Sequence, residues 1–303
     1  MTNTEYLSKV LDTIETRDSL HAYSIRKGIK QGDNLDYLID VVCGYFVEKE
    51  IPIEKLVNDY LLMIADIRSE TALFLISGKY SCANQKEAFD KFYSNSEVMS
   101  YYMNGLLLST ILWRHHFDLL GFFMDNMDYY LRDKRINILD VGSGHGINSR
   151  IVADYEYDID SFDVVDMSES SLEMAKSVIS LNTVNYICID AMIMKPKKKY
   201  DLIILGEILE HLDDPLSMLK KMRTLLNDDG VIWVTVPMNA PTIDHVYLFK
   251  SQNEVFDLIE DAGLITVDST ITHADNLTSI VGTFCKRYEI RGYKSRGYKV
   301  GKV

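Results

Sequence analysis

Residues 140–146 of the chain read Asp140-Val141-Gly142-Ser143-Gly144-His145-Gly146. The stretch follows an apolar run, Ile136–Val141, that has the length and composition of a buried strand. Its three glycines permit a tight turn and allow a ligand to approach the backbone closely. A helix begins at about Ile147, so its first N–H groups point at the same place. This strand, turn and helix indicate a site for a nucleotide-like cofactor.

Short apolar runs and helical segments alternate from this motif to the end of the folded part of the chain. The expected strands are Ile136–Val141, Ser161–Val165, Asn185–Ile189, Asp201–Leu205, Val231–Val236, Ile265–Thr270 and Ser279–Cys285. Helices are expected to start near Ile147, Ser168, Asp213 and Ser251. This order predicts a Rossmann-like, doubly wound α/β fold with a seven-stranded, mostly parallel sheet. The last two strands form a hairpin-like pair, which makes one strand antiparallel.

The residues before this region have a different pattern, with apolar side chains at helical spacing. Two such stripes are Tyr6, Val10, Leu11, Ile14 and Leu35, Leu38, Ile39, Val42, Cys43. We therefore expect residues 1–133 to form an all-α domain of six or seven helices. Turns are expected at residues 32–34 and 78–81.

Residues 98–124 are apolar nearly all round a helix, so they either pack in a core or line a pocket. Composition alone favours the core. Five aromatic and histidine side chains keep the pocket interpretation open, and they are the candidate substrate contacts of this domain: Tyr101, Tyr102, Trp113, His115 and His116.

Composition excludes several classes of function. The 303 residues carry a formal net charge of −13, which disfavours a nucleic-acid partner because phosphate binding depends on Lys and Arg. The four cysteines show no metal-ligand or disulfide spacing, so no metal site is expected. The sequence shows neither a secretory signal nor a membrane-spanning run, and we expect a cytoplasmic protein without membrane contact. Residues 287–303 form a basic, tyrosine-containing tail. Its composition is typical either of a solvated terminus or of a segment that contacts RNA or an acidic partner.

The ordered motifs of residues 134–286 resemble those of the class I S-adenosylmethionine-dependent methyltransferases. The first motif of that family is acidic-x-Gly-x-Gly-x-Gly, which Asp140 to Gly146 match at every specified position. The resemblance implies S-adenosylmethionine as the cofactor, Asp166 on its ribose hydroxyls and Asp190 on its adenine amino group. Its implied cofactor-binding residues are Asp140, Gly142, Ser143, Gly144, Gly146, Asp166, Met167, Asp190, Ala191, Gly206 and Glu207.

Each of the three aspartates also has a structural interpretation. Asp140 could cap the glycine turn, Asp166 could cap the following helix, and Asp190 could be an ordinary turn residue.

The acceptor of the methyl group is expected beyond the carboxyl ends of the strands. Two histidines follow strands there, and both are candidate catalytic residues: His211 in a Glu-His dipeptide, and His245, which is also a candidate substrate contact. The relatives that methylate amides or nucleic-acid adenines carry an Asn/Asp-Pro-Pro-Tyr/Phe segment where this chain has Leu205–Ile208. The favoured acceptor is therefore an oxygen or nitrogen of a small metabolite or natural-product intermediate.

Two other functions stay open at this point. A nicotinamide-dependent oxidoreductase would carry Gly or Ala at position 147, where this chain has Ile147. A non-catalytic protein could use the same fold to bind the cofactor for regulation. The helical domain could act as a lid, determine specificity or form a homodimer.

Overall fold

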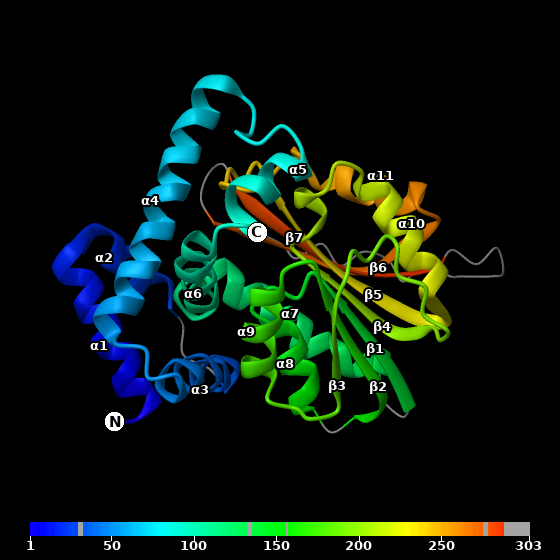
Figure 1. Cartoon of the computed structure of the whole chain (residues 1–303), viewed down its shortest axis with the longest axis horizontal. Helices are drawn as coiled ribbons and strands as arrows, with labels where there is room; N and C mark the ends of the chain where they lie inside the picture. The colour runs from blue at the N-terminus through cyan, green and yellow to red at the C-terminus, as the bar shows by residue number, and fades with distance from the viewer. Residues whose placement is uncertain (30–32, 132–134, 156, 275–277, 288–303) are drawn as a thin grey trace.

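A computed structural model describes residues 1–29, 33–131, 135–155, 157–274 and 278–287 (Figure 1). The expected basic tail therefore lies almost wholly outside the described residues. Of the expected turns, the one at residues 32–34 lies partly outside them, and the one at residues 78–81 is present, with Gly78 ending a helix at φ 67°.

The N-terminal part is helical, as predicted. Its elements are α1 (Asn3–Arg17), α2 (Ser19–Gly28), α3 (Asp33–Glu48), α4 (Ile53–Ser77), α5 (Gln85–Ala88), η1 (Phe89–Tyr93), α6 (Ser96–Leu112) and α7 (Arg114–Leu131). Both predicted apolar stripes are buried in the core. The chain enters α1 through a capping box, in which the Thr2 side chain accepts from the Glu5 amide and the Glu5 side chain accepts from the Thr2 amide.

The long apolar segment at 98–124 is two helices rather than one. Its break is at Trp113, whose backbone is extended at φ −102° and ψ 121°. The Trp113 amide donates to the Ser109 carbonyl and closes α6, and the Trp113 carbonyl accepts from the Phe117 amide at the start of α7. Hydrophobic periodicity continues through the break, which is why the sequence did not reveal it.

The C-terminal part is a seven-stranded sheet, as predicted. Its strands are β1 (Arg135–Val141), β2 (Asp158–Asp166), β3 (Val184–Cys188), β4 (Tyr200–Gly206), β5 (Leu226–Met238), β6 (Leu264–His273) and β7 (Ser279–Arg287). They lie in the order β3-β2-β1-β4-β5-β7-β6. Among the described strands, β7 runs opposite to the other six, so it pairs antiparallel with both of its neighbours, β5 and β6. The strand order switches from one side of β1 to the other between β1 and β4, although these two strands are parallel. Doubly wound sheets bind their ligands at such a switch point.

Helices cover both faces of this sheet. They are α8 (Ile147–Asp154), α9 (Glu169–Ile179), η2 (Leu209–His211), α10 (Pro215–Leu225) and α11 (Gln252–Asp261). Figure 1 shows α8 and α9 on one side of the sheet, with α10 and α11 on the other. The core of the first face is continuous with the N-terminal helices. None of the helices in the described part of the chain combines the length and hydropathy needed to cross a bilayer.

The helix α7 joins the two parts of the protein. Phe123 of α7 stacks on Trp233 of β5 with ring centroids 5.1 Å apart, and Tyr130 lies 4.7 Å from the ring of Phe284 in β7. The helix α7 lies before residue 134, where the sequence predicted the domain boundary, yet it packs on the sheet. The N-terminal helices and the sheet therefore share one apolar core.

Candidate functional site

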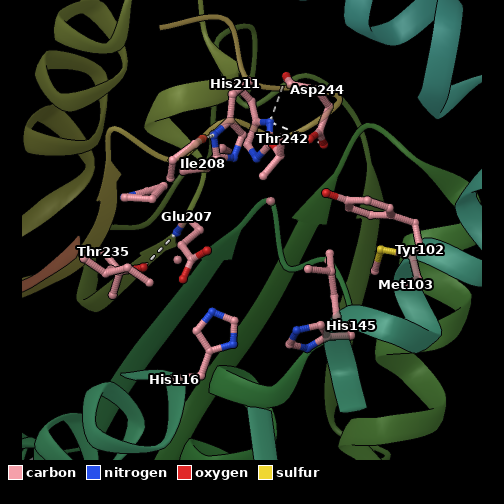
Figure 2. Close-up of a pocket in the computed structure, with 18 of the residues that line it drawn as sticks. Tyr102, Met103, His116, His145, Glu207, Ile208, His211, Thr235, Thr242 and Asp244 are labelled. Carbon is pink, nitrogen blue, oxygen red and sulfur yellow. Dashed lines mark hydrogen bonds and ion pairs between the residues drawn. The ribbon is translucent and has the colours of Figure 1, made fainter. Parts of the chain in front are cut away.

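A cavity of about 1320 Å³ lies above the carboxyl ends of the central strands. Its floor is formed by the loops that follow β1, β2, β3 and β4 and by the end of β5. Its cover comes from α6, from Trp113 and from the first turns of α7. Figure 2 shows side chains from the strand ends and from the helical cover pointing into the same space.

The glycine turn adopts the tight conformation that its sequence predicts. Gly142, Gly144 and Gly146 have φ values of 66°, 51° and 80°, which disfavour residues with a side chain. The Gly142 amide donates to the Val165 carbonyl at 2.7 Å and ties the turn to β2. The Ser143 hydroxyl is buried, lines the cavity and has no hydrogen-bond partner in the structure. The turn thus presents backbone and an unsatisfied hydroxyl to a ligand.

The three predicted aspartates have different surroundings. Asp166, at the end of β2, accepts from the Gly144 amide at 3.2 Å and from the Ser168 amide at 2.8 Å, and it lines the cavity. Burial raises the pKa of its carboxyl. Asp190 also lines the cavity and accepts from the Met192 amide at 2.8 Å. Met167, Ala191 and Gly206 complete the cavity lining on this side.

Asp140 and Gly146 shape the site without lining the cavity. The Ser149 hydroxyl donates to the Asp140 carboxylate at 2.6 Å, which connects β1 to α8. Burial raises the pKa of Asp140 to about 7, although the Ser149 hydrogen bond acts in the opposite direction.

Glu207 is the acid that follows β4. Its backbone has φ 51°, a conformation that costs free energy for a residue with a side chain. Its amide donates to the Thr235 hydroxyl at 2.9 Å and to the Thr235 carbonyl at 3.2 Å, which holds the residue in place. Figure 2 shows its carboxyl group pointing into the cavity. Burial raises the pKa of this carboxyl to about 7, so a cationic ligand is favoured beside it once it ionises.

The two predicted catalytic histidines lie together at one end of the cavity. His211 belongs to η2 and His245 to the loop after β5, and their ring centroids are 4.8 Å apart. Nδ1 of His245 lies 2.7 Å from the Ala240 carbonyl oxygen, and Nδ1 of His211 lies 3.2 Å from the Asp244 carbonyl oxygen. Burial lowers the pKa of His245 to about 3, so its ring is neutral near pH 7.

Three further residues of this end were not singled out by the sequence. Glu210 is fully buried, and neither of its carboxylate oxygens has a hydrogen-bond partner in the structure. Asp244 accepts from the Tyr93 hydroxyl at 2.8 Å. The one sequence signal for Glu210 was its place beside His211. Tyr93 belongs to η1, which is far in sequence from both Glu210 and Asp244, so no local pattern connects it with them.

The helical cover supplies four of the five side chains predicted there. Tyr102, Trp113, His115 and His116 line the cavity, whereas Tyr101 does not and instead donates its hydroxyl to Asp66 at 2.6 Å. Nδ1 of His116 lies 3.0 Å from the Ser109 hydroxyl, and burial lowers its pKa well below the usual value. His145, in the glycine turn, also lines the cavity, and burial lowers its pKa to about 4.

A family model described as a methyltransferase domain matches residues 112–273, slightly more than half of the chain. The chain belongs to this methyltransferase family. The match begins at the end of α6 and includes α7, the helix that packs on the sheet. Its membership confirms the resemblance to the class I methyltransferases, whose cofactor is S-adenosylmethionine.

Two curated relatives are O-methyltransferases. The ubiquinone biosynthesis O-methyltransferase of Coxiella burnetii (strain Dugway 5J108-111) is 31% identical over 126 residues, which cover 41% of this chain and 52% of that protein. The malonyl-[acyl-carrier protein] O-methyltransferase 1 of Ilyobacter polytropus is 32% identical over 100 residues, covering 33% and 37%. The chain therefore matches about half the length, or less, of these relatives.

Two solved structures share the fold. The structure described as PigF with SAH has a TM-score of 0.53 at 14% identity, over 77% of this chain and 73% of that one. The N-methyltransferase NodS from Bradyrhizobium japonicum WM9 in complex with S-adenosyl-l-homocysteine has a TM-score of 0.50 at 13% identity, over 67% and 98%. At these identities the likeness shows the fold alone, and it confirms the Rossmann-like architecture.

Proposed function

We propose that this chain transfers the methyl group of S-adenosylmethionine to an oxygen or nitrogen of a small, largely apolar acceptor. The observation that carries the proposal is one large cavity, which joins the glycine turn and the loops after the strands to a cover of apolar and histidine side chains. Oxygen is the favoured atom, because the two curated relatives described above are O-methyltransferases.

The residues of the cavity floor fit the cofactor. The Gly144 and Ser168 amides hold the Asp166 carboxylate, whose remaining lone pairs are suited to accept the protons of a ribose diol. Asp190 is the corresponding candidate for the adenine amino group. The glycine turn leaves room for the ligand, since a Cβ atom on Gly144 would meet nothing closer than Met103 Cε at 3.6 Å. Glu207 offers a negative charge for the cationic end of the molecule.

In the proposed reaction, the residues of this chain position the acceptor atom against the methyl group and exclude water from the cavity. S-adenosylmethionine supplies an electrophilic methyl group on a sulfonium, and the acceptor atom must lie within about 3.5 Å of it, in line with the C–S bond. The cover of α6 and the segment 112–116 closes the cavity over that space with Tyr102, Trp113 and His116. Apolar side chains beside them match an acceptor with a hydrophobic body: Leu106, Leu119, Leu120, Trp233 and Ile280.

The proposal is tested in two steps. In separate titrations, isothermal titration calorimetry should show that one molecule of S-adenosylmethionine, or one molecule of S-adenosylhomocysteine, binds to each chain. Incubation with methyl-labelled S-adenosylmethionine and a small-molecule extract should then transfer label to an organic-soluble product. Binding without transfer to any fraction would favour a regulatory protein, and no binding of either ligand would refute the proposal.

A further inference from the structure

We propose that Glu210, His211 and His245 form a binding site for a divalent transition-metal ion at the end of the cavity. One carboxylate oxygen and two ring nitrogens lie within 4.8 Å of one another. Within the described residues this is the cluster of three or more such side chains that could hold a metal ion. The proposal departs from the expectation of no metal, which rested on the spacing of the cysteines.

The distances within the cluster are close to those of a metal site. Oε1 of Glu210 lies 3.6 Å from Nε2 of His211 and 3.9 Å from Nε2 of His245. Both distances are too long for hydrogen bonds. Bonds of about 2.0–2.1 Å in a tetrahedral site place ligand atoms about 3.3 Å apart. Each ring nitrogen would need to approach Oε1 by a few tenths of an ångström to share an ion with it. The two ring nitrogens, which lie within 4.8 Å of each other, would need to approach each other by up to about 1.5 Å.

The carboxylate of Glu210 is the independent observation that points to a ligand. Its side chain has no exposed surface, and both of its oxygens lack a hydrogen-bond partner in the structure. A buried carboxyl group without partners costs free energy, and proteins rarely retain one. A bound cation would supply the missing partner. It would also explain why the Nε2 atoms of both histidines lie within 4 Å of Oε1 without forming a hydrogen bond to it.

The outer contacts of the two histidines orient them as ligands. A carbonyl oxygen only accepts, so Nδ1 of His245 donates to Ala240 and Nδ1 of His211 donates to Asp244. Nε2 of each neutral ring then carries a free lone pair, and in both rings this atom is the one near Glu210. Histidine ligands of metals commonly have this arrangement, with the second nitrogen bound to a carbonyl or carboxylate.

The donor set indicates the class of ion. Imidazole nitrogens suit zinc, iron, copper and nickel, whereas magnesium prefers oxygen ligands alone. Two imidazoles and one carboxylate, with further positions open, are the ligands of several catalytic zinc sites. His211 and His245 line the cavity, so the open positions face the space where an acceptor would lie.

This position gives the ion a role that rests on the proposed function. An acceptor hydroxyl that binds an ion loses its proton more easily. The proton leaves to solvent, the oxygen forms its new bond to the methyl carbon, and the sulfur keeps the electron pair of the broken C–S bond. The site thus favours acceptors with a hydroxyl group, and in particular acidic ones such as phenols or enols.

The experiment measures metal binding without the cofactor, so its outcome is separate from that of the methyltransferase test. Protein stripped with a chelator is titrated with Co²⁺, followed by visible absorption, and with Zn²⁺, followed by calorimetry. We expect one ion per chain, at least tenfold weaker binding in Glu210→Gln and in His245→Asn, and no comparable binding of Mg²⁺. His273→Asn is the matched control, since His273 also lines the cavity but lies outside the cluster, and it should bind as the wild type does.

Two outcomes would overturn the proposal. One is the absence of stoichiometric Co²⁺ or Zn²⁺ binding in the wild-type protein, which decides the matter even if a variant fails to fold. The other is binding that survives in folded Glu210→Gln and is lost in His116→Asn, because it would place the ion at the His115–His116 pair of the cover instead.

Discussion

Gly146 and Ala175 pack so closely that there is no space for a side chain between them. A Cβ atom on Gly146 would lie 2.9 Å from the Cα atom of Ala175 and 3.0 Å from its Cβ atom. Gly146 also has φ 80°, a conformation that residues with a side chain rarely adopt. The last glycine of the turn is therefore required by the contact between the turn and α9, while the cavity is lined by its neighbours.

We expect Gly146→Ala to lower the free energy of unfolding by about 2 kcal/mol or more, because it combines a strained φ with a clash against backbone. Urea denaturation measures the change. Gly44→Ala is the matched control: Gly44 lies inside α3 and a Cβ atom there meets nothing within 4 Å. That change should stabilise the protein by about 0.5–1 kcal/mol. Equal effects of the two substitutions would contradict this account of the turn.

Replacing Asp166 tests the ribose contact. Asp166→Ala removes the carboxylate that the Gly144 and Ser168 amides hold beside the cavity, and we expect S-adenosylmethionine to bind at least about tenfold more weakly, a loss of about 1.4 kcal/mol or more. Calorimetry on the two proteins checks the change. Asp257→Ala, on the exposed side of α11, should keep wild-type affinity. If Asp166→Ala also kept it, the assignment of Asp166 would be wrong.

Asp140 should make the fold less stable at higher pH. Its pKa is raised from 3.8 to about 7, so between these values the folded state holds a proton that the unfolded chain has released. The contribution of Asp140 is then fully present below about pH 4 and is lost as the pH rises through 7.

We expect Asp140→Asn to flatten this dependence and to raise the free energy of unfolding at about pH 8 by up to about 4 kcal/mol, since its pKa is raised from 3.8 to about 7 and one pKa unit corresponds to about 1.4 kcal/mol. Denaturation at about pH 5 and pH 8 measures the difference, and the asparagine oxygen can still accept from Ser149. An unchanged pH dependence would show that Asp140 does not titrate in this interval.

Glu207 should make cofactor affinity depend on pH. Burial raises the pKa of its carboxyl to about 7, and only the ionised form attracts the positive charges of S-adenosylmethionine. Affinity is thus expected to increase as the pH rises through about 7, and Glu207→Gln should bind more weakly at about pH 8, by about tenfold, with a smaller pH dependence. Calorimetric titrations at several pH values test this. The variant serves as its own control at about pH 5, where wild-type Glu207 is protonated and the two proteins should bind alike.

The strands, their alternation with helices along the chain and the glycine turn were predictable because they depend on local sequence patterns. Alternating apolar runs determine strands, and a left-handed turn requires glycine. That Asp166 and Asp190 line one cavity was predictable for the same reason, since each lies at or just beyond the end of a strand and parallel strands end at one edge.

The contribution of the helical cover was harder to predict. Tyr101 and Tyr102 are adjacent on α6, but neighbouring residues on a helix point about 100° apart, and only Tyr102 faces the cavity. Which one does so depends on how α6 packs on α4 and on the break at Trp113, and neither leaves a periodic signal. The sequence did not single out Glu210, because its place beside His211 does not reveal that its carboxyl group is buried without a hydrogen-bond partner.

The stacking of Phe123 on Trp233 has a consequence for any attempt to exchange parts of this chain with those of a relative. A chimera joined at residue 134 would import a foreign α7 and lose the surface that was matched to β5 and β7. A junction at Trp113, where the backbone is already extended, leaves that helix with the sheet it covers and transfers only α1 to α6. The contribution of α1 to α6 to acceptor preference should therefore be exchangeable between relatives at Trp113, with the fold of the sheet left intact.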